Sequence, residues 1–230
     1  SSTSRGLGDV YKRQVLTRVD GIRLPWLDDG ARGVKGGLEA VDFNSLSRLD
    51  IVRGADATGG GSGAMSATAD LYTLDPSDLL TGGKTFGALA KTDYDSADAS
   101  WGANAALAGQ IRSNTFWLVQ AGVRNGHDID NRGDVGGYGP KRSQPSPEDY
   151  DQQSFLMKLQ QRVEGGHRFG LTGEYFKRRA DIDNMYDQGA GTSYLYGENS
   201  TKKETERERV SFDYSLSLIH ISEPTRRRGI

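Results

Sequence analysis

The chain has 230 residues with 29 basic and 31 acidic side chains, so its formal net charge is −2. Nucleic-acid binding needs clustered Lys and Arg, and no basic block occurs between residues 15 and 215, so we expect no nucleic-acid partner. The absence of cysteine excludes disulfides, thiolate metal sites and cysteine nucleophiles. No apolar run reaches the roughly 20 residues of a membrane-spanning helix, whereas a strand of a membrane barrel needs only about 9–11 residues.

The two ends of the chain, 1–14 and 216–230, are expected to be foreign to the protein. Asp9–Gln14 back-translates as GATGTGTATAAGAGACAG, and Leu216–Ile221 as its reverse complement CTGTCTCTTATACACATC. That string is the transposon end used in preparing sequencing libraries; the alternative is a natural basic tail at each end. Because non-native segments are excluded from fold reasoning, we interpret 15–215 as the native part, cut from a longer gene.

The first native part, 15–80, has a mixed α/β pattern. A glycine-rich segment, 59–63, separates two short extended runs and lets backbone pass close to other backbone. The expected elements are a strand at Val15–Ile22 closed by Asp20-Gly21, a polar loop at Leu27–Gly37, a short helical turn at Asp42–Ser47 capped by Asp42, and strands at Leu49–Val52 and Ala69–Thr73.

From residue 84 onward the hydrophobic pattern has a period of two. Six runs alternate apolar with polar or small residues, which predicts an antiparallel sheet with one wet face. The expected strands are Phe86–Ala90, Trp101–Ala108, Trp117–Arg124, Phe155–Val163, Phe169–Tyr175 and Arg209–Tyr214.

The connections between these strands differ in length. Ile111–Asn114 and Glu164–Gly166 are short, whereas Asp128–Gln153 and Asp181–Glu206 are long, and the long ones fall at the same end of the sheet. Outer-membrane barrels sort their connections in this way, with tight turns inside and long loops outside. Aromatic residues near the strand ends would then form interfacial girdles; the alternative is ordinary core aromatics.

Two motifs carry a family resemblance. VDGI at Val19–Ile22 and RLDIVRG at Arg48–Gly54, followed by the glycine-rich segment, resemble the plug of TonB-dependent outer-membrane receptors. The match departs from that pattern at Ala55, where the family has Pro, and at Gly60, where it has Tyr. The resemblance implies a membrane β-barrel with an N-terminal α/β plug, located in a Gram-negative cell outer membrane. The plug's C-terminal part would be 15–80, and about six antiparallel barrel strands with their loops would occupy 81–215.

Further motifs resemble the haem and haemoglobin receptor branch of that family. They are Leu74–Leu80, Val123–Asp128, Asn131–Asp134, Pro145–Asp149, Ser154–Leu159 and His167–Glu174. The branch imports haem, sometimes from a haemoprotein, with energy from the TonB complex, so haem is cargo and no cofactor is expected. Alternatives are a siderophore or other metal-chelate receptor, or a soluble β-rich binding or adhesin module. No catalytic constellation is present, so we do not expect an enzyme.

Three candidate ligand residues lie in the loop that, by resemblance, faces upward from the plug. Trp26 would offer apolar area, and Arg32 or Lys35 would pair with the propionates of haem. The alternative is a loop that serves only plug packing. Arg53 resembles the plug arginine that locks onto barrel-wall glutamates, since a buried charge needs such partners; the alternative is an exposed turn residue.

The barrel part offers two further candidates. His127 stands where a strand meets the first long loop, so it is placed to contact haem or a protein partner, or else it is a solvated loop residue. Tyr138, with Tyr150, Tyr194 and Tyr196, would stack on a porphyrin or a protein surface, or pack within the loops. We interpret His167 as structural and Lys202–Arg209 as a solvated loop edge, and we expect no metal site.

Overall fold

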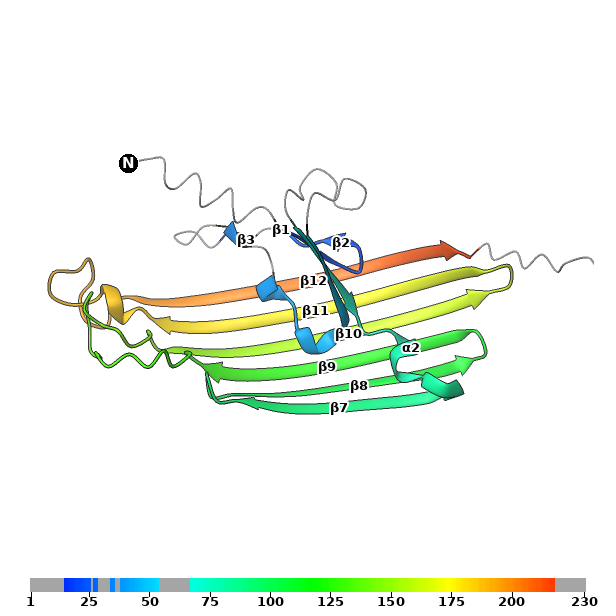
Figure 1. The fold of residues 1–230 in the computed structure, drawn as a ribbon, viewed down its shortest axis with the longest axis horizontal. Helices are drawn as coiled ribbons and strands as arrows, with labels where there is room; N and C mark the ends of the chain where they lie inside the picture. Colours follow the sequence, from blue (N-terminus) through cyan, green and yellow to red (C-terminus); the bar gives the residue numbers. More distant parts are fainter. Residues whose placement is uncertain (1–14, 26, 29–33, 36–37, 54–66, 218–230) are drawn as a thin grey trace, which may run out of the picture.

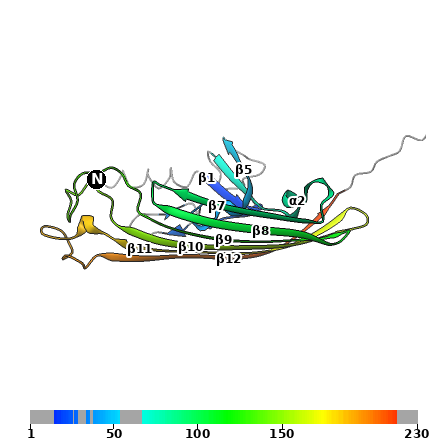
Figure 2. The same cartoon turned by 90° about the horizontal axis from the view of Figure 1, so that it is seen from below.

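The computed structural model describes residues 15–25, 27–28, 34–35, 38–53 and 67–217 (Figure 1). These residues form a small N-terminal unit and a layer of six long antiparallel strands, which we call the strand wall. The N-terminal unit crosses one side of the strand wall, as the two views in Figures 1 and 2 show.

The N-terminal unit is built on a four-stranded sheet with the order β2-β1-β6-β5. β1 and β6 run parallel, and the other pairs are antiparallel. Val19, Leu24, Val41 and Leu71 form its core. The elements are β1 (Val15–Val19), β2 (Ile22–Arg23), β3 (Leu27–Asp28), β4 (Val34–Lys35), η2 (Leu38–Ala40), η3 (Phe43–Ser45), β5 (Leu46–Arg53), β6 (Ala67–Thr73), α2 (Pro76–Leu79) and η4 (Thr81–Gly83).

Two local predictions for this unit have different outcomes. The turn capped by Asp42 is confirmed, because its carboxylate accepts a hydrogen bond from the Asn44 backbone N–H at 2.9 Å. The polar loop predicted at Leu27–Gly37 is wrong in part, since β3 pairs with β4 there. Strands of two residues are too short to show the alternation on which the sequence prediction depended.

The strand wall contains all six predicted strands in consecutive antiparallel order. Their bounds are β7 (Phe86–Asp95), β8 (Ser100–Arg112), β9 (Thr115–His127), β10 (Glu148–Val163), β11 (His167–Asp183) and β12 (Ser200–Leu216). The two long connections, 128–147 and 184–199, lie together at one end of the wall, with the short β7–β8 turn (96–99), and the tight turns 113–114 and 164–166 lie at the other end (Figure 1).

The two faces of the strand wall have opposite chemistry. On the face toward the N-terminal unit, Gln120, Ser154 and Lys158 are buried. On the opposite face, Phe155 and Leu159 remain more than 40% exposed. That face also presents Leu107, Val123, Met157, Leu171, Val210 and Phe212. A sheet that buries polar groups and exposes a continuous apolar band is arranged for lipid on one side and an enclosed polar space on the other.

The apolar band ends at the same level on neighbouring strands. Phe155 lies opposite Tyr175, and beyond this level the outward residues of β11 and β12 are charged. Lys177 forms ion pairs with Glu204 at 2.8 Å and Glu206 at 3.2 Å. The strands therefore continue past the apolar band as a water-exposed ladder joined by cross-strand charge pairs.

This extension corrects three sequence predictions. The long connections were expected at Asp128–Gln153 and Asp181–Glu206. Residues 148–153 instead belong to β10, 181–183 to β11 and 200–206 to β12. Lys202–Arg209 was expected to be a loop edge and instead lies within β12. The physical reason is that a strand exposed to water on both faces does not alternate apolar with polar residues, and this alternation was the signal used to predict strands.

Among the described residues, the helices are all too short and too polar to cross a membrane.

Candidate functional site

The contact between the N-terminal unit and the strand wall begins at the turn joining β1 and β2. Asp20 and Gly21 have φ angles of 48° and 79°, which are the left-handed values that a tight two-residue hairpin requires. Asp and Gly tolerate these values better than bulky side chains do. The turn presents the Asp20 carboxylate to Thr73, which donates from its backbone N–H at 2.9 Å and its hydroxyl at 2.6 Å.

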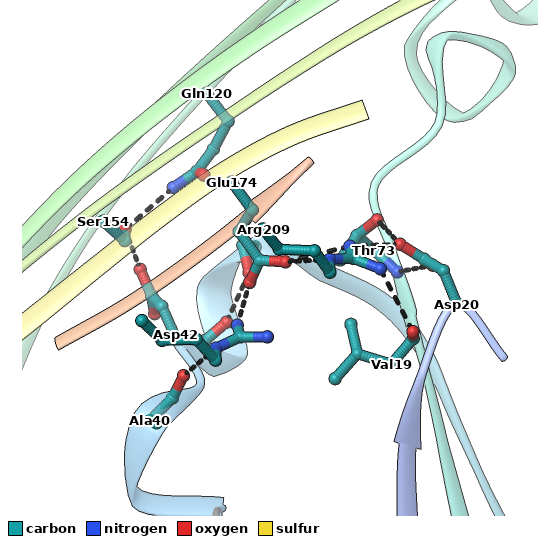
Figure 3. Close-up of polar contacts among 11 residues, drawn as sticks. Val19, Asp20, Ala40, Asp42, Thr73, Gln120, Ser154, Glu174 and Arg209 are labelled. Atoms are coloured by element: carbon teal, nitrogen blue, oxygen red, sulfur yellow. Dashed lines mark hydrogen bonds and ion pairs between the residues drawn. The ribbon is translucent and has the colours of Figure 1, made fainter. Parts of the chain in front are cut away.

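Two arginines of β12 hold this turn and the neighbouring η2 (Figure 3). Arg209 donates to the Val19 carbonyl at 3.1 Å and pairs with the Asp20 carboxylate at 2.7 Å. Arg207 donates to the Ala40 carbonyl at 2.8 Å. Both guanidinium groups therefore reach from the strand wall to backbone or side-chain oxygens of the N-terminal unit.

A single carboxylate on β11 bridges both arginines, and Asp20 supplies the second negative charge. Glu174 pairs with Arg209 at 2.9 Å and with Arg207, and the three side chains are 5–10% exposed. Arginine supplies planar donors suited to bridging carboxylates in this way. We call Glu174, Arg207 and Arg209, with Asp20 and the two carbonyls they bind, the charged clamp.

A second polar link lies at η3. The free oxygen of the Asp42 carboxylate accepts a hydrogen bond from the Ser154 hydroxyl on β10, and Ser154 in turn accepts from the Gln120 amide at 3.2 Å (Figure 3). Lys91 on β7 donates to the Asn44 side-chain oxygen at 3.0 Å. Asp42 thus caps its own helical turn and ties that turn to the strand wall.

An apolar contact completes the attachment on the side of β8, β9 and β10. Leu74, Leu118 and Leu156 are buried together, and they pack with Ala106 and Ala108. Leu79 and Leu80, at the end of α2, cover this cluster. We call these residues the apolar seam.

Two carboxylates of the N-terminal unit, Asp20 and Asp75, have shifted pKa values. Burial by itself raises the pKa of Asp20, but the charge of Lys158 and hydrogen bonds from Arg209 and Thr73 hold that pKa below its ordinary value of 3.8. Burial also raises the pKa of Asp75, yet hydrogen bonds from Ser77 and Gln160 lower it overall. Both groups therefore remain ionised at neutral pH.

The outer connections pack against one another. The Tyr138 and Tyr196 rings meet edge to face at 5.0 Å, and the Gly139 backbone N–H donates to the Met185 carbonyl at 2.9 Å. His127 ends β9, and its Nδ1 lies 2.5 Å from an Asp149 carboxylate oxygen on β10. The structure thus brings Tyr138 into a loop surface exposed to solvent and places His127 at its base.

Tyr150 was predicted from the sequence to lie in a long outer loop, but the structure does not place it there. It lies in β10, is buried, and donates from its hydroxyl to the Asp98 carboxylate at 2.7 Å. The Arg178 guanidinium stacks over its ring at 4.1 Å. These contacts make Tyr150 a structural residue of the wall.

The candidates of the N-terminal unit fall largely outside the described residues. Trp26 and Arg32 lie outside them altogether. Lys35 belongs to β4 and Arg53 ends β5, and only their backbone is described. Their proposed roles as ligand residues and as a lock therefore remain predictions.

The charged clamp was missed by the sequence reasoning. Its signal was present: in Glu204–Arg209 every second residue is acidic, and the intervening residues are Thr205, Arg207 and Arg209. As strand residues, Glu204, Glu206 and Glu208 point outward, while Arg207 and Arg209 face the N-terminal unit. Charge alternation, not apolar alternation, would have identified this strand.

The architecture defines a class of protein. A compact unit packs on the polar face of a strand wall whose opposite face is apolar, as in a membrane barrel with a plug domain. Residues 1–68 match the family model of the TonB-dependent receptor plug domain. This part of the chain is therefore similar to that plug domain, and the N-terminal unit is called the plug from here on.

Curated relatives and solved structures extend this comparison. The chain is 25% identical to hemoglobin and hemoglobin-haptoglobin-binding protein A of Haemophilus influenzae, over 89% of this chain and 20% of that protein. It is 28% identical to lactoferrin-binding protein A of Neisseria meningitidis, over 60% of this chain and 15% of that protein. The FrpB iron transporter of N. meningitidis shares the fold, with a TM-score of 0.70 at 19% identity, covering 90% of this chain and 31% of that one. The chain thus spans about a fifth of the relatives' length.

Proposed function

We propose that this chain is part of an outer-membrane receptor that imports haem or iron from a haemoprotein, with energy from the TonB complex. The chemistry is binding and transport, without a catalytic step. Haem is the cargo in this proposal, and lipid of the outer membrane is the partner of the apolar face of the strand wall.

The proposal depends on one observation, the packing of the plug against the polar face of the strand wall. The plug binds the polar face through the charged clamp and the Asp42 link, while the opposite face is an apolar band. A barrel of the 22-stranded transporter class encloses a plugged lumen, so cargo passes only when the plug shifts. The relatives named for haemoglobin binding support haem or haemoprotein as the cargo.

The mechanism follows from where the long loops and the plug–wall contacts lie. The loops 128–147 and 184–199, with Tyr138 and His127, lie at the end where an external ligand would arrive. The charged clamp and the Asp42 link are made of hydrogen bonds and ion pairs, which water can replace as the plug moves. Pulling on the plug would therefore open a path along the polar face of the wall.

A growth experiment tests the proposal. A complete receptor carrying this sequence is expressed in a Gram-negative host without its own haem receptors, with haemoglobin or haemin as the sole iron source. We expect growth in the host with intact TonB and none in the same host lacking TonB. Growth that does not depend on TonB, or no growth on either source, contradicts the proposal.

A second candidate is a receptor for another iron carrier. Its support is the relative named for lactoferrin binding and the fold shared with an iron transporter. The same strains grown on iron-loaded lactoferrin or on a panel of ferric siderophores separate the two candidates. A soluble adhesin module is disfavoured because exposed apolar bands of this extent are rare on soluble monomers.

A further inference from the structure

A cavity of about 570 Å³ lies between the plug and the strand wall, on the side of η3. Its plug side is formed by η2, η3 and the residues between them, and its wall side by four of the long strands. The lining residues are Leu38, Val41, Asp42, Phe43, Asn44, Lys91, Asp93, Arg124, Gln152 and Arg178. None of them belongs to the charged clamp or the apolar seam.

The wall side of this cavity carries three cations. Arg124 is matched by Asp93 and also donates to the Ser100 hydroxyl at 2.9 Å. Arg178 lies 3.5 Å from Glu148 and stacks over Tyr150. These two guanidinium groups are held in place by carboxylates already present in the wall.

Lys91 differs from the two arginines. Its ammonium donates to the neutral Asn44 side chain at 3.0 Å, and no carboxylate among the described residues lies within ion-pair distance of it. An ammonium has three donors, so with respect to the described residues Lys91 keeps donors and a charge without a carboxylate partner. The Asp93 oxygen Oδ1 is buried and receives no hydrogen bond from any described residue, so the wall also presents one acceptor.

The plug side of the cavity adds three apolar side chains, Leu38, Val41 and Phe43, beside the polar Asp42 and Asn44. Phe43 is 58% exposed and Leu38 40% exposed, although each belongs to a short helical turn of a folded unit. An exposed ring opposite an unmatched ammonium suits a ligand with an apolar body and an anionic edge. A carboxylate is the simplest group that fits the Lys91 side.

We propose that this cavity is a transit subsite for a carboxylate-bearing metal chelate, with Lys91 binding the carboxylate and Phe43 contacting the chelate's apolar body. The inference rests on the proposed function, because it requires cargo that passes between plug and wall. The bound carboxylate accepts from the donors of Lys91 that Asn44 does not use.

The test uses the complete receptor in detergent and three probes: haemin, its dimethyl ester, and ferric citrate. The ester has the same ring as haemin without free carboxylates. We expect Lys91→Met to weaken haemin binding about tenfold, since a charge-assisted hydrogen bond is lost, and to leave binding of the ester unchanged. Lys91→Arg should retain most of the affinity for haemin.

Lys202→Met serves as the matched control, because Lys202 lies on β12 outside this cavity. It should change binding of none of the probes. If Lys91→Met loses haemin and ester binding equally, the fold is damaged and the inference is overturned. Unchanged haemin binding in Lys91→Met also overturns the inference. If the wild type binds ferric citrate through Lys91 but not haemin, the subsite stands and the haem assignment fails. If the wild type binds none of the probes, both fail.

Discussion

The plug is attached to the strand wall by two regions of different chemistry. The apolar seam joins the end of α2 to β8, β9 and β10 through fully buried leucines. The charged clamp joins the β1–β2 turn and η2 to β11 and β12 through two arginines that share one glutamate. Nonpolar packing depends on area and tolerates small shifts, whereas the clamp depends on the direction of each hydrogen bond.

This difference indicates how the plug can be both stable and removable. Separating the seam exposes apolar surface to water, which costs free energy in proportion to area. Separating the clamp exchanges its hydrogen bonds for bonds to water, so the net loss is smaller provided that water enters. We therefore expect the plug to part from the wall first at the clamp, with the seam as the last contact to open.

The largest effect is expected from Glu174→Gln. The substitution leaves Arg207 buried without a carboxylate partner and Arg209 with Asp20 alone, and an uncompensated buried charge of this kind costs about 3–5 kcal/mol. Denaturant unfolding of the complete receptor in detergent measures the loss. The control is Glu204→Gln on the outward face of β12, which should change stability little; equal effects would contradict the clamp.

Leu156→Ala should have the next largest effect. Leu156 is fully buried in the apolar seam, and truncating a buried leucine costs about 2–5 kcal/mol through lost burial and the cavity left behind. Leu159→Ala, three residues along the same strand and half-exposed on the opposite face, is the matched control. If the two variants lose the same stability in detergent, the seam is not a buried contact.

Most of the strand wall could be predicted from the sequence, and much of the site could not. Runs such as Trp117–Arg124 and Phe155–Val163 alternate because one face meets an apolar environment, so a period-two pattern finds them. The outer part of β12 has water or charge on both faces, and its strand form depends on cross-strand partners that lie up to 35 residues away. Such partners become visible only when the register is known.

The candidate ligand residues illustrate the same limit. The VDGI motif correctly placed a turn at Asp20, because its Asp-Gly pair satisfies a local backbone requirement. The motif does not reveal that the Asp20 carboxylate meets Arg209, which is 189 residues away in the chain. Arg53 was predicted from resemblance to be a lock and stays a prediction, because only its backbone is described; the arginines of the charged clamp come from the wall.

Ser154→Ala should weaken the plug's attachment by a smaller amount. The Asp42 carboxylate would lose its hydrogen bond from the wall while keeping its bond to the Asn44 backbone N–H, at a cost of about 1–3 kcal/mol. Protease cleavage of the plug in the complete receptor reports this change. Gln153→Ala, the adjacent residue on the outward face, should cleave at the wild-type rate; faster cleavage in both variants would assign the effect to the strand and not to the link.

The smallest effect is expected from acid. The pKa of Asp20 is depressed in the folded state, so its contribution to stability is complete above the unfolded value near 3.8 and is lost as pH falls through the lower folded value. Plug release measured between pH 7 and pH 3 should therefore increase only below about pH 4. Asp20→Asn should already be partly released at pH 7 and show a shallower acid dependence; an unchanged acid profile would remove Asp20 from the clamp.

The central claim is that one face of the strand wall meets lipid while the other encloses the plug. The chain contains no cysteine, so single cysteines introduced into it can carry a nitroxide at a known position. Collision rates with oxygen, which concentrates in lipid, and with a water-soluble nickel chelate are measured at Val123, Phe155 and Leu159 and at the inward positions Gln120 and Ser154. The account predicts high oxygen and low nickel accessibility at the first three positions, and low oxygen accessibility at the last two. Nickel access at Phe155 and Leu159, or burial of both against protein, would contradict it.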